Sequence, residues 1–79
     1  LRGVEQARST ISAAERGVVS AEAAYRVRRD QYRAGRAKNV ELTDAETELT
    51  RARIDYIDAL IDARIAKVRM DYALGRLQP

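Results

Sequence analysis

Cysteine, histidine, tryptophan and phenylalanine are all absent from this chain of 79 residues. Without cysteine and histidine there is no disulfide, thiol nucleophile or imidazole base, and the side chains that most often hold zinc are missing. No apolar run reaches the roughly 18–20 residues of a membrane-spanning helix, and no signal peptide is visible. We therefore expect neither an enzyme nor a protein that carries a metal or another cofactor.

Large apolar side chains are also scarce, although 46% of the residues are hydrophobic. Fourteen residues are alanine, and each of their methyl groups removes little area from water. Below roughly 80 residues, a lone core rarely supplies more than about 3–5 kcal/mol. The chain begins with Leu1 rather than methionine. Together these features lead us to expect a segment of a longer protein.

Apolar residues recur at alternating spacings of three and four, the pattern of helices in a coiled coil. Arg28 interrupts the first series, which resumes at Tyr32, whereas the second series has no polar interruption. We call the two series the core stripes. They comprise Val4, Ala7, Ile11, Ala14, Val18, Ala21 and Tyr25, and then Leu42, Ala45, Leu49, Ala52, Tyr56, Ala59, Ala63, Ala66, Met70, Ala73 and Leu77.

The break between the two series is short. Gly35 can take the left-handed conformation that ends a helix, and Asn39 is a suitable N-cap for the helix that follows. Thr43 and Glu46 also have capping-box spacing, so the second helix could begin at either point. The pattern predicts an all-α fold, a two-helix antiparallel coiled-coil hairpin, with residues 1–79 as a single unit. Its helices are expected at about 2–34 and 40–76, joined by a turn at about 35–39.

Each predicted helix carries a second stripe beside its core stripe. The small-residue stripe of the first helix comprises Ala13, Gly17, Ser20, Ala24 and Val27, and the isoleucine stripe of the second comprises Ile54, Ile57, Ile61, Ile65 and Val68. A hairpin needs only one stripe per helix. The second stripes therefore indicate either a broader apolar face in a small bundle or a ring in which every helix touches two others. We also expect self-association as paired hairpins that form a four-helix bundle.

The residues around the turn resemble the TolC-like outer-membrane efflux proteins. In that family an aromatic residue precedes a small-residue–Gly turn, and a short polar stretch leads into an acidic-apolar-x-Asp-Ala run. Tyr32, Gly35, Glu41, Leu42, Asp44 and Ala45 match this order and spacing. Ala52, Arg53, Tyr56 and the Ala73-Leu74-Gly75 ending are similar to the closing helix of the family.

The resemblance implies a fragment of a periplasmic α-barrel in a Gram-negative bacterium. In the family, three chains contribute twelve helices to this barrel, which hangs from an outer-membrane β-barrel. The implied function is export through a tripartite efflux or secretion system, with a periplasmic adaptor protein as partner. The helical tips close the channel at rest and dock onto the adaptor.

Site residues follow from the same resemblance. It implies an adaptor-docking tip made of Tyr32, Gly35, Arg36, Ala37 and Lys38, and an acidic pore entrance made of Glu41 and Asp44. Two departures stand out, because position 41 holds glutamate where aspartate is familiar, and Ala37 stands where some members place a bridging arginine. Arg36 could serve in its place.

Simpler interpretations remain open for these residues. Glu41 and Asp44 could merely stabilise the positive end of the helix dipole, and Tyr32 could be a core residue. Residues 26–38 contain six cations, and Asp30 is the only acid among them. These cations form either a solvated face or a patch that steers a partner or binds phosphates. These cations are Arg26, Arg28, Arg29, Arg33, Arg36 and Lys38.

Two other classes of function compete with export. The first is a generic structural or dimerisation coiled-coil hairpin without a transport role. The second is a basic module that binds nucleic acid or an anionic membrane. No aromatic residues suited to base stacking are interleaved with the cations, so we do not expect nucleic acid as a partner.

Overall fold

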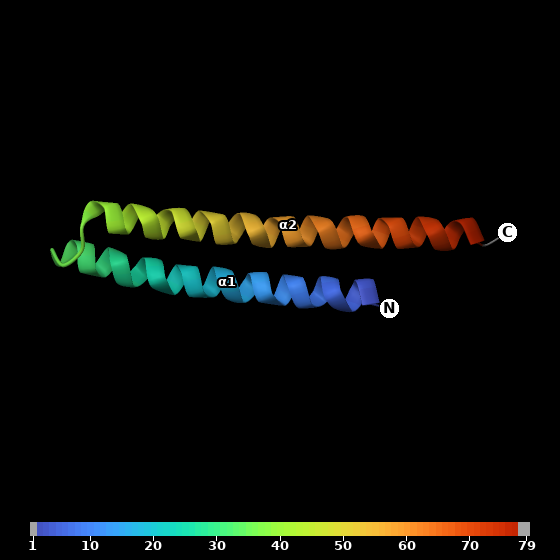
Figure 1. The fold of residues 1–79 in the computed structure, drawn as a ribbon, viewed down its shortest axis with the longest axis horizontal. Coiled ribbons are helices and arrows are strands. Elements are labelled where there is room, and N and C mark those ends of the chain that lie inside the picture. Colours follow the sequence, from blue (N-terminus) through green and yellow to red (C-terminus); the bar gives the residue numbers. More distant parts are fainter. Residues whose placement is uncertain (1, 78–79) are drawn as a thin grey trace.

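The computed structural model describes residues 2–77, with the side chains of residues 3 and 5–75. Within residues 2–77 the chain forms two α-helices and no strand, with α1 over Arg2–Arg33 and α2 over Asn39–Leu77. The helices lie antiparallel, side by side, in a rod of 68 × 15 × 11 Å (Figure 1). The predicted all-α hairpin is confirmed.

The turn between the helices is closed by a Schellman motif. The amide of Gly35 donates to the carbonyl of Tyr32 at 3.0 Å, and the amide of Arg36 donates to the carbonyl of Gln31 at 2.7 Å. Gly35 has a φ of 74°, the left-handed conformation that this motif requires and that glycine adopts without a steric penalty. The glycine in the turn therefore ends α1 as the sequence indicates.

The start of α2 differs from the expected one. The amides of Glu41 and Leu42 both donate to the carbonyl of Lys38, at 3.0 and 3.3 Å. The carbonyl of an N-cap residue accepts the first hydrogen bonds of a helix, so the N-cap position falls on Lys38 rather than on Asn39 or Thr43. As a result, α2 begins one residue earlier than expected. It also ends one residue later, and α1 ends one residue earlier.

The core stripes face each other along the rod. Leu49 and Ala59 are buried, each 7% exposed, and most other described members of the stripes are half-buried. Ala66 and Ala73 are exposed, and the end of α2 extends past the start of α1 (Figure 1). The side chains of Val4 and Leu77, also expected in the stripes, lie outside the described ones.

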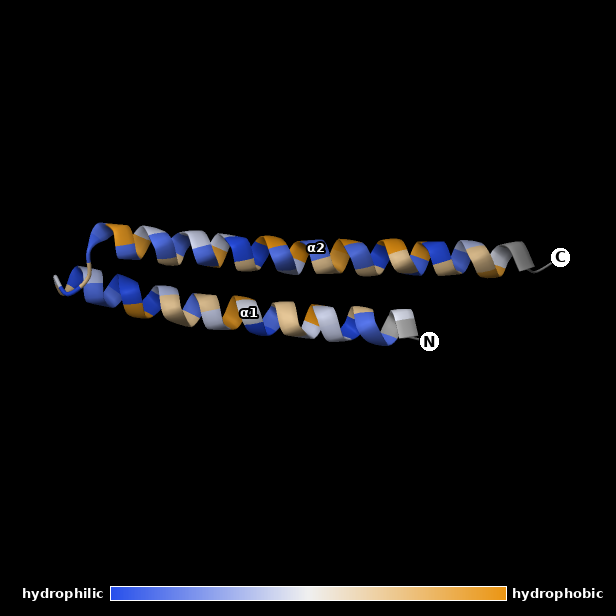
Figure 2. Ribbon diagram, in the orientation of Figure 1, coloured by the Kyte–Doolittle hydropathy of each residue, from blue (hydrophilic) through white to orange (hydrophobic). Residues whose placement is uncertain are grey.

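The second stripes remain uncovered in this hairpin. Members of the isoleucine stripe are 44–61% exposed, and every member of the small-residue stripe is exposed as well. Figure 2 shows that strongly hydrophobic residues recur along most of α2. No helix within residues 2–77 has an apolar stretch of the length needed to cross a bilayer. The fold therefore buries one stripe per helix and presents the other to whatever surrounds it.

Candidate functional site

The five residues expected at a docking tip lie at one end of the rod. Tyr32 is 42% exposed, so its side chain is accessible within this hairpin. Gly35, Arg36 and Lys38 are exposed, and Ala37 is half-buried. The turn therefore offers an accessible surface with two cationic side chains.

Glu41 and Asp44, the residues expected at an acidic entrance, lie near the start of α2. Both line a groove of about 240 Å³ between the helices, which we call the acidic groove. Its lining comprises Ala21, Ala24, Arg28, Glu41, Asp44, Ala45 and Glu48. Glu41 lies in the first turn of α2, whereas Asp44 is the sixth residue of the helix. Stabilisation of the helix dipole, which is confined to the first turn, therefore accounts for Glu41 alone.

Arg28 is the residue of this region whose role the sequence left unassigned. Its Nη1 atom donates to Oε2 of Glu41 and to Oε1 of Gln31, both at 3.1 Å. The sequence does carry a signal for this residue, because Arg28 is a charged residue at a position where the core stripe of α1 would have an apolar one. The ion pair offsets the charge of Glu41, whereas no ion pair among the described side chains involves Asp44. Of Glu41 and Asp44, Asp44 is therefore the carboxylate whose charge no ion pair offsets.

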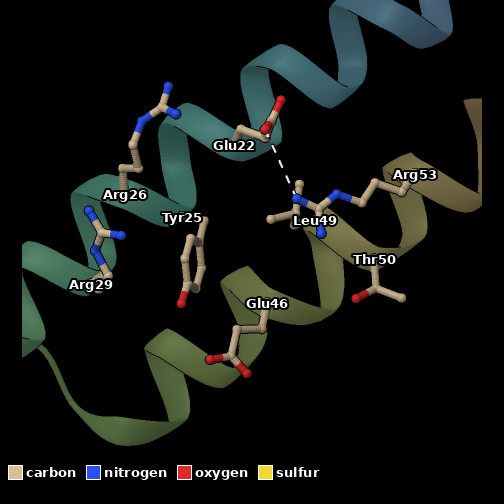
Figure 3. A pocket seen from close by; sticks show the side chains of 8 residues that line it. All are labelled: Glu22, Tyr25, Arg26, Arg29, Glu46, Leu49, Thr50 and Arg53. Carbon is tan, nitrogen blue, oxygen red and sulfur yellow. Dashed lines mark ion pairs between the residues drawn. The ribbon is translucent and has the colours of Figure 1, made fainter.

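A second groove lies between the helices (Figure 3). Heptad positions place its lining on the side of the hairpin opposite to the acidic groove. It measures about 450 Å³ and shares no residue with the acidic groove. Residues that flank a core stripe on its two sides point to opposite faces of a helix pair. We call this second groove the arginine groove. Its lining comprises Glu22, Tyr25, Arg26, Arg29, Glu46, Leu49, Thr50 and Arg53. Three guanidinium groups against two carboxylates give this lining a net charge of +1.

The cations of the arginine groove are only weakly neutralised. The Nη2 atom of Arg53 lies 4.0 Å from Oε2 of Glu22 (dashed in Figure 3). The Nε atom of Arg29 lies 3.6 Å from Oδ1 of Asp30, and it is buried without a hydrogen-bond partner. Among the side chains that the structure describes, no ion pair or hydrogen bond involves Arg26. The groove therefore has cationic hydrogen-bond donors available for an anionic group.

A third polar contact between the helices lies farther from the turn. The hydroxyl of Tyr56 donates to Oε1 of Glu15 at 3.2 Å. Partial burial raises the pKa of Tyr56 above its usual value, and the hydrogen bond to Glu15 and its negative charge raise this pKa further. The contact joins α1 and α2 and helps to hold their relative position along the rod.

The described residues offer little support for metal binding or covalent chemistry. Within the described part of the chain, no group of three or more histidine, cysteine, aspartate or glutamate side chains could hold a metal ion. The side chains that the structure does bring together are arginines and carboxylates on an exposed helical surface. Such an arrangement is suited to binding rather than to covalent chemistry.

Comparison with known proteins decides the family. The model of the outer membrane efflux protein family matches residues 2–76, which include α1, the turn and all of α2 except its last residue. The chain belongs to the outer membrane efflux protein family. The predicted resemblance to TolC-like proteins is confirmed, and as a family member the chain is a component of an outer-membrane efflux channel. No significant match was found among curated proteins or among solved structures.

Proposed function

We propose that this hairpin forms part of the periplasmic wall of a trimeric outer-membrane efflux channel. Its turn docks onto a periplasmic adaptor protein of a tripartite pump. The observation that carries the proposal is the exposure of both second stripes in a member of this family. Since Leu49 and Ala59 alone are buried among the described apolar side chains, the hairpin depends on neighbours to cover the rest.

The placement of the second stripes supports a closed ring of helices. Heptad positions put the isoleucine stripe mainly on the edge of α2 remote from α1. They put the small-residue stripe on a flank of α1, on the side of the acidic groove, which Ala24 lines. Large residues on one edge and small residues on another allow a close head-to-tail contact between successive hairpins. Repeated head-to-tail contacts close into a ring when the rotation allows it.

The docking surface is proposed to be Tyr32, Gly35, Arg36, Ala37 and Lys38. Among the described side chains, neither Arg36 nor Lys38 has an ion pair, so both charges are available to acidic groups of an adaptor. The Schellman motif around Gly35 gives the turn a defined backbone. A preorganised turn loses less conformational entropy when it binds.

Glu41 and Asp44 are proposed to face the channel entrance. Threefold repetition of these carboxylates would surround the pore with negative charge, which favours cations over anions. Because Arg28 pairs with Glu41 at 3.1 Å, Asp44 contributes more of this charge. Replacing Asp44 by asparagine should therefore reduce the cation selectivity of the channel more than replacing Glu41 by glutamine, as measured by reversal potentials in planar bilayers.

The docking proposal is tested by charge reversal at the turn of the whole channel protein. Arg36→Glu should abolish export while the trimer still assembles, as judged by drug susceptibility of cells and by native electrophoresis. Arg69→Glu, an exposed cation far from the turn, is the matched control and should leave export intact. Normal export with Arg36→Glu would overturn the docking assignment, and so would equal losses with both variants.

A structural dimerisation hairpin is the alternative, favoured by the same exposed isoleucine stripe. In that case two hairpins would cover each other in a four-helix bundle and no adaptor would be needed. The two functions separate in cells, because a dimerisation module tolerates charge reversal at Arg36 and the channel does not.

A further inference from the structure

We propose that the arginine groove binds the carboxylates of an acidic helix from a partner protein (Figure 3). The proposal rests on the proposed function only for the identity of that partner, the adaptor. The groove itself is defined by residues of both helices, at the same level of the rod as the acidic groove. It is separate from the five residues assigned to the docking tip.

The cations on α1 form a row rather than a single point of charge. Arg26, Arg29 and Arg33 are spaced by three and four residues, so they share one side of α1. Arg33 lies seven positions after Arg26, so the row is roughly 10 Å long on the helix. Among the described side chains, no ion pair or hydrogen bond involves Arg33. A row of this length fits carboxylates one and two turns apart on a helix better than it fits one small anion.

The floor and far wall of the groove restrict where an acidic helix can lie. Leu49 is buried and Tyr25 is half-buried, so an apolar surface lies between the two helices. Glu22 on α1 and Arg53 on α2 face each other at 4.0 Å and offset each other's charge. Of the other charged groups, Glu46 on the α2 side repels a carboxylate, whereas Arg26 and Arg29 on the α1 side attract it (Figure 3). The bound helix is therefore placed along α1, where arginine can donate two hydrogen bonds to each carboxylate.

The opposite face of the hairpin disfavours the same partner. Glu41, Asp44 and Glu48 line the acidic groove, and like charges brought together across an interface lower affinity. An acidic helix thus distinguishes the two faces of the hairpin. If Glu41 and Asp44 face the pore, as proposed above, the arginine groove faces outward, where a partner surrounding the channel can reach it.

The test uses an alanine-rich helical peptide with glutamates at heptad spacing and a matched peptide with glutamine at the same positions. Each is titrated into the ¹⁵N-labelled chain, and the arginine Nε–Hε signals are followed by NMR. The glutamate peptide should shift the signals of Arg26 and Arg29, and the glutamine peptide should not. The double substitution R26Q/R29Q should weaken binding of the glutamate peptide about tenfold or more, a change of about 1.4 kcal/mol in binding free energy.

The double substitution R16Q/R69Q is the matched control, because it removes the same charge from exposed residues outside the groove. It should change the affinity by less than about twofold, because exposed charges farther than a Debye length from the bound peptide are largely screened. Equal weakening by both double variants would overturn the proposal, since it would show attraction to net charge alone. Equal shifts with inorganic phosphate at the same concentration would also overturn it, in favour of a free anion.

Two measurements keep this result independent of other effects. Helicity from circular dichroism shows whether R26Q/R29Q still folds, and the single substitution R26Q is used if it does not. The peptide titration needs no assembled channel. Its failure would therefore remove the arginine groove as a binding site, whereas failure of the docking tip is reported separately by export with Arg36→Glu.

Discussion

Arg28 on α1 and Glu41 on α2 are joined by a 3.1 Å hydrogen bond between Nη1 and Oε2, immediately beside the turn. Of the two ion pairs that link the helices among the described side chains, it is the shorter, since Arg53 and Glu22 are 4.0 Å apart. Arg28 occupies the position where an apolar residue would continue the core stripe of α1. It therefore exchanges apolar packing for a polar link to an acid of the proposed channel entrance.

A double-mutant cycle with Arg28→Gln and Glu41→Gln should give a coupling free energy of at most about 1 kcal/mol, because both side chains are partly exposed to solvent. The measurement is urea unfolding followed by circular dichroism, and added salt should reduce the coupling. Arg51 and Glu48, an exposed pair within α2 at 3.1 Å, provide the control cycle. A coupling for Arg28 and Glu41 below that of the control would contradict a role in holding the helices together.

Replacing Gly35 by alanine should destabilise the hairpin by about 1–2 kcal/mol, because its φ of 74° brings a Cβ atom close to the following carbonyl. Gly35→Asn should cost less, since asparagine tolerates this conformation better. Gly75→Ala is the matched control, as Gly75 is helical and its added Cβ meets no atom within 4 Å. Thermal unfolding of the three variants measures the difference. Equal effects at positions 35 and 75 would show that the turn is not under this constraint.

Substitutions at Gly17 should affect the isolated hairpin and the assembled channel differently. An added Cβ at this position meets no atom within 4 Å, so Gly17→Ala should stabilise the hairpin by about 1 kcal/mol through helix propensity alone. Gly17→Leu should still allow the hairpin to fold but should impair trimer assembly, because the small-residue stripe would no longer admit a neighbouring helix closely. Trimers that form normally with leucine at position 17 would place the neighbouring helix elsewhere.

The isoleucine stripe should drive self-association of the hairpin. Ile57→Asp combined with Ile61→Asp should shift the chain toward monomer in sedimentation equilibrium without loss of helicity, because both side chains are about half exposed and do not form the core. Val40→Asp, which replaces an exposed residue outside the stripe, is the control and should leave association unchanged. A wild-type chain that is monomeric at high micromolar concentration would contradict the prediction.

Tyr56 should titrate at higher pH than an ordinary tyrosine, because partial burial and the contact with Glu15 favour its neutral form. A pKa that is higher in the folded chain stabilises the fold fully below the usual tyrosine pKa, and this contribution is lost as pH rises through the folded value. Glu15→Gln should lower the pKa of Tyr56. The difference in tyrosinate absorbance between the wild-type chain and Tyr56→Phe isolates this group, and an unchanged titration in Glu15→Gln would remove Glu15 as a cause.

Those parts of the fold that depend on neighbours in the sequence could be predicted, and the contacts between helices could not. The spacing of residues such as Leu49 and Ala59 marks the buried stripe, and Gly35 marks the end of α1, since both signals are local. The pairing of Tyr56 with Glu15 depends on how far one helix is shifted along the other. The conformation of the turn sets that shift. The residue pattern within a single helix does not determine it.

The same limit applies to the candidate site. The run of cations near the turn is visible in the sequence, but Arg53 lies 24 positions beyond Arg29 and joins that cluster only when the chain folds back. The core interruption at Arg28 is visible too, yet its partner Glu41 is fixed by the hairpin geometry. Conversely, the N-cap falls on Lys38 through its backbone carbonyl, which side-chain preferences do not reveal.

The narrowest dimension of the rod, 11 Å, means that a wall built from such hairpins is a single helix thick. Charges on its two surfaces are then separated by little more than the Debye length of about 8 Å at physiological ionic strength, and protein rather than saltwater fills much of the space between them. A carboxylate arriving at Arg26 on one surface therefore alters the electrostatic potential that an ion experiences near Asp44 on the other. If the acidic groove faces the pore and the arginine groove binds a partner, as proposed, the partner's contact and the channel's ion preference would be coupled through this field without any movement of the backbone.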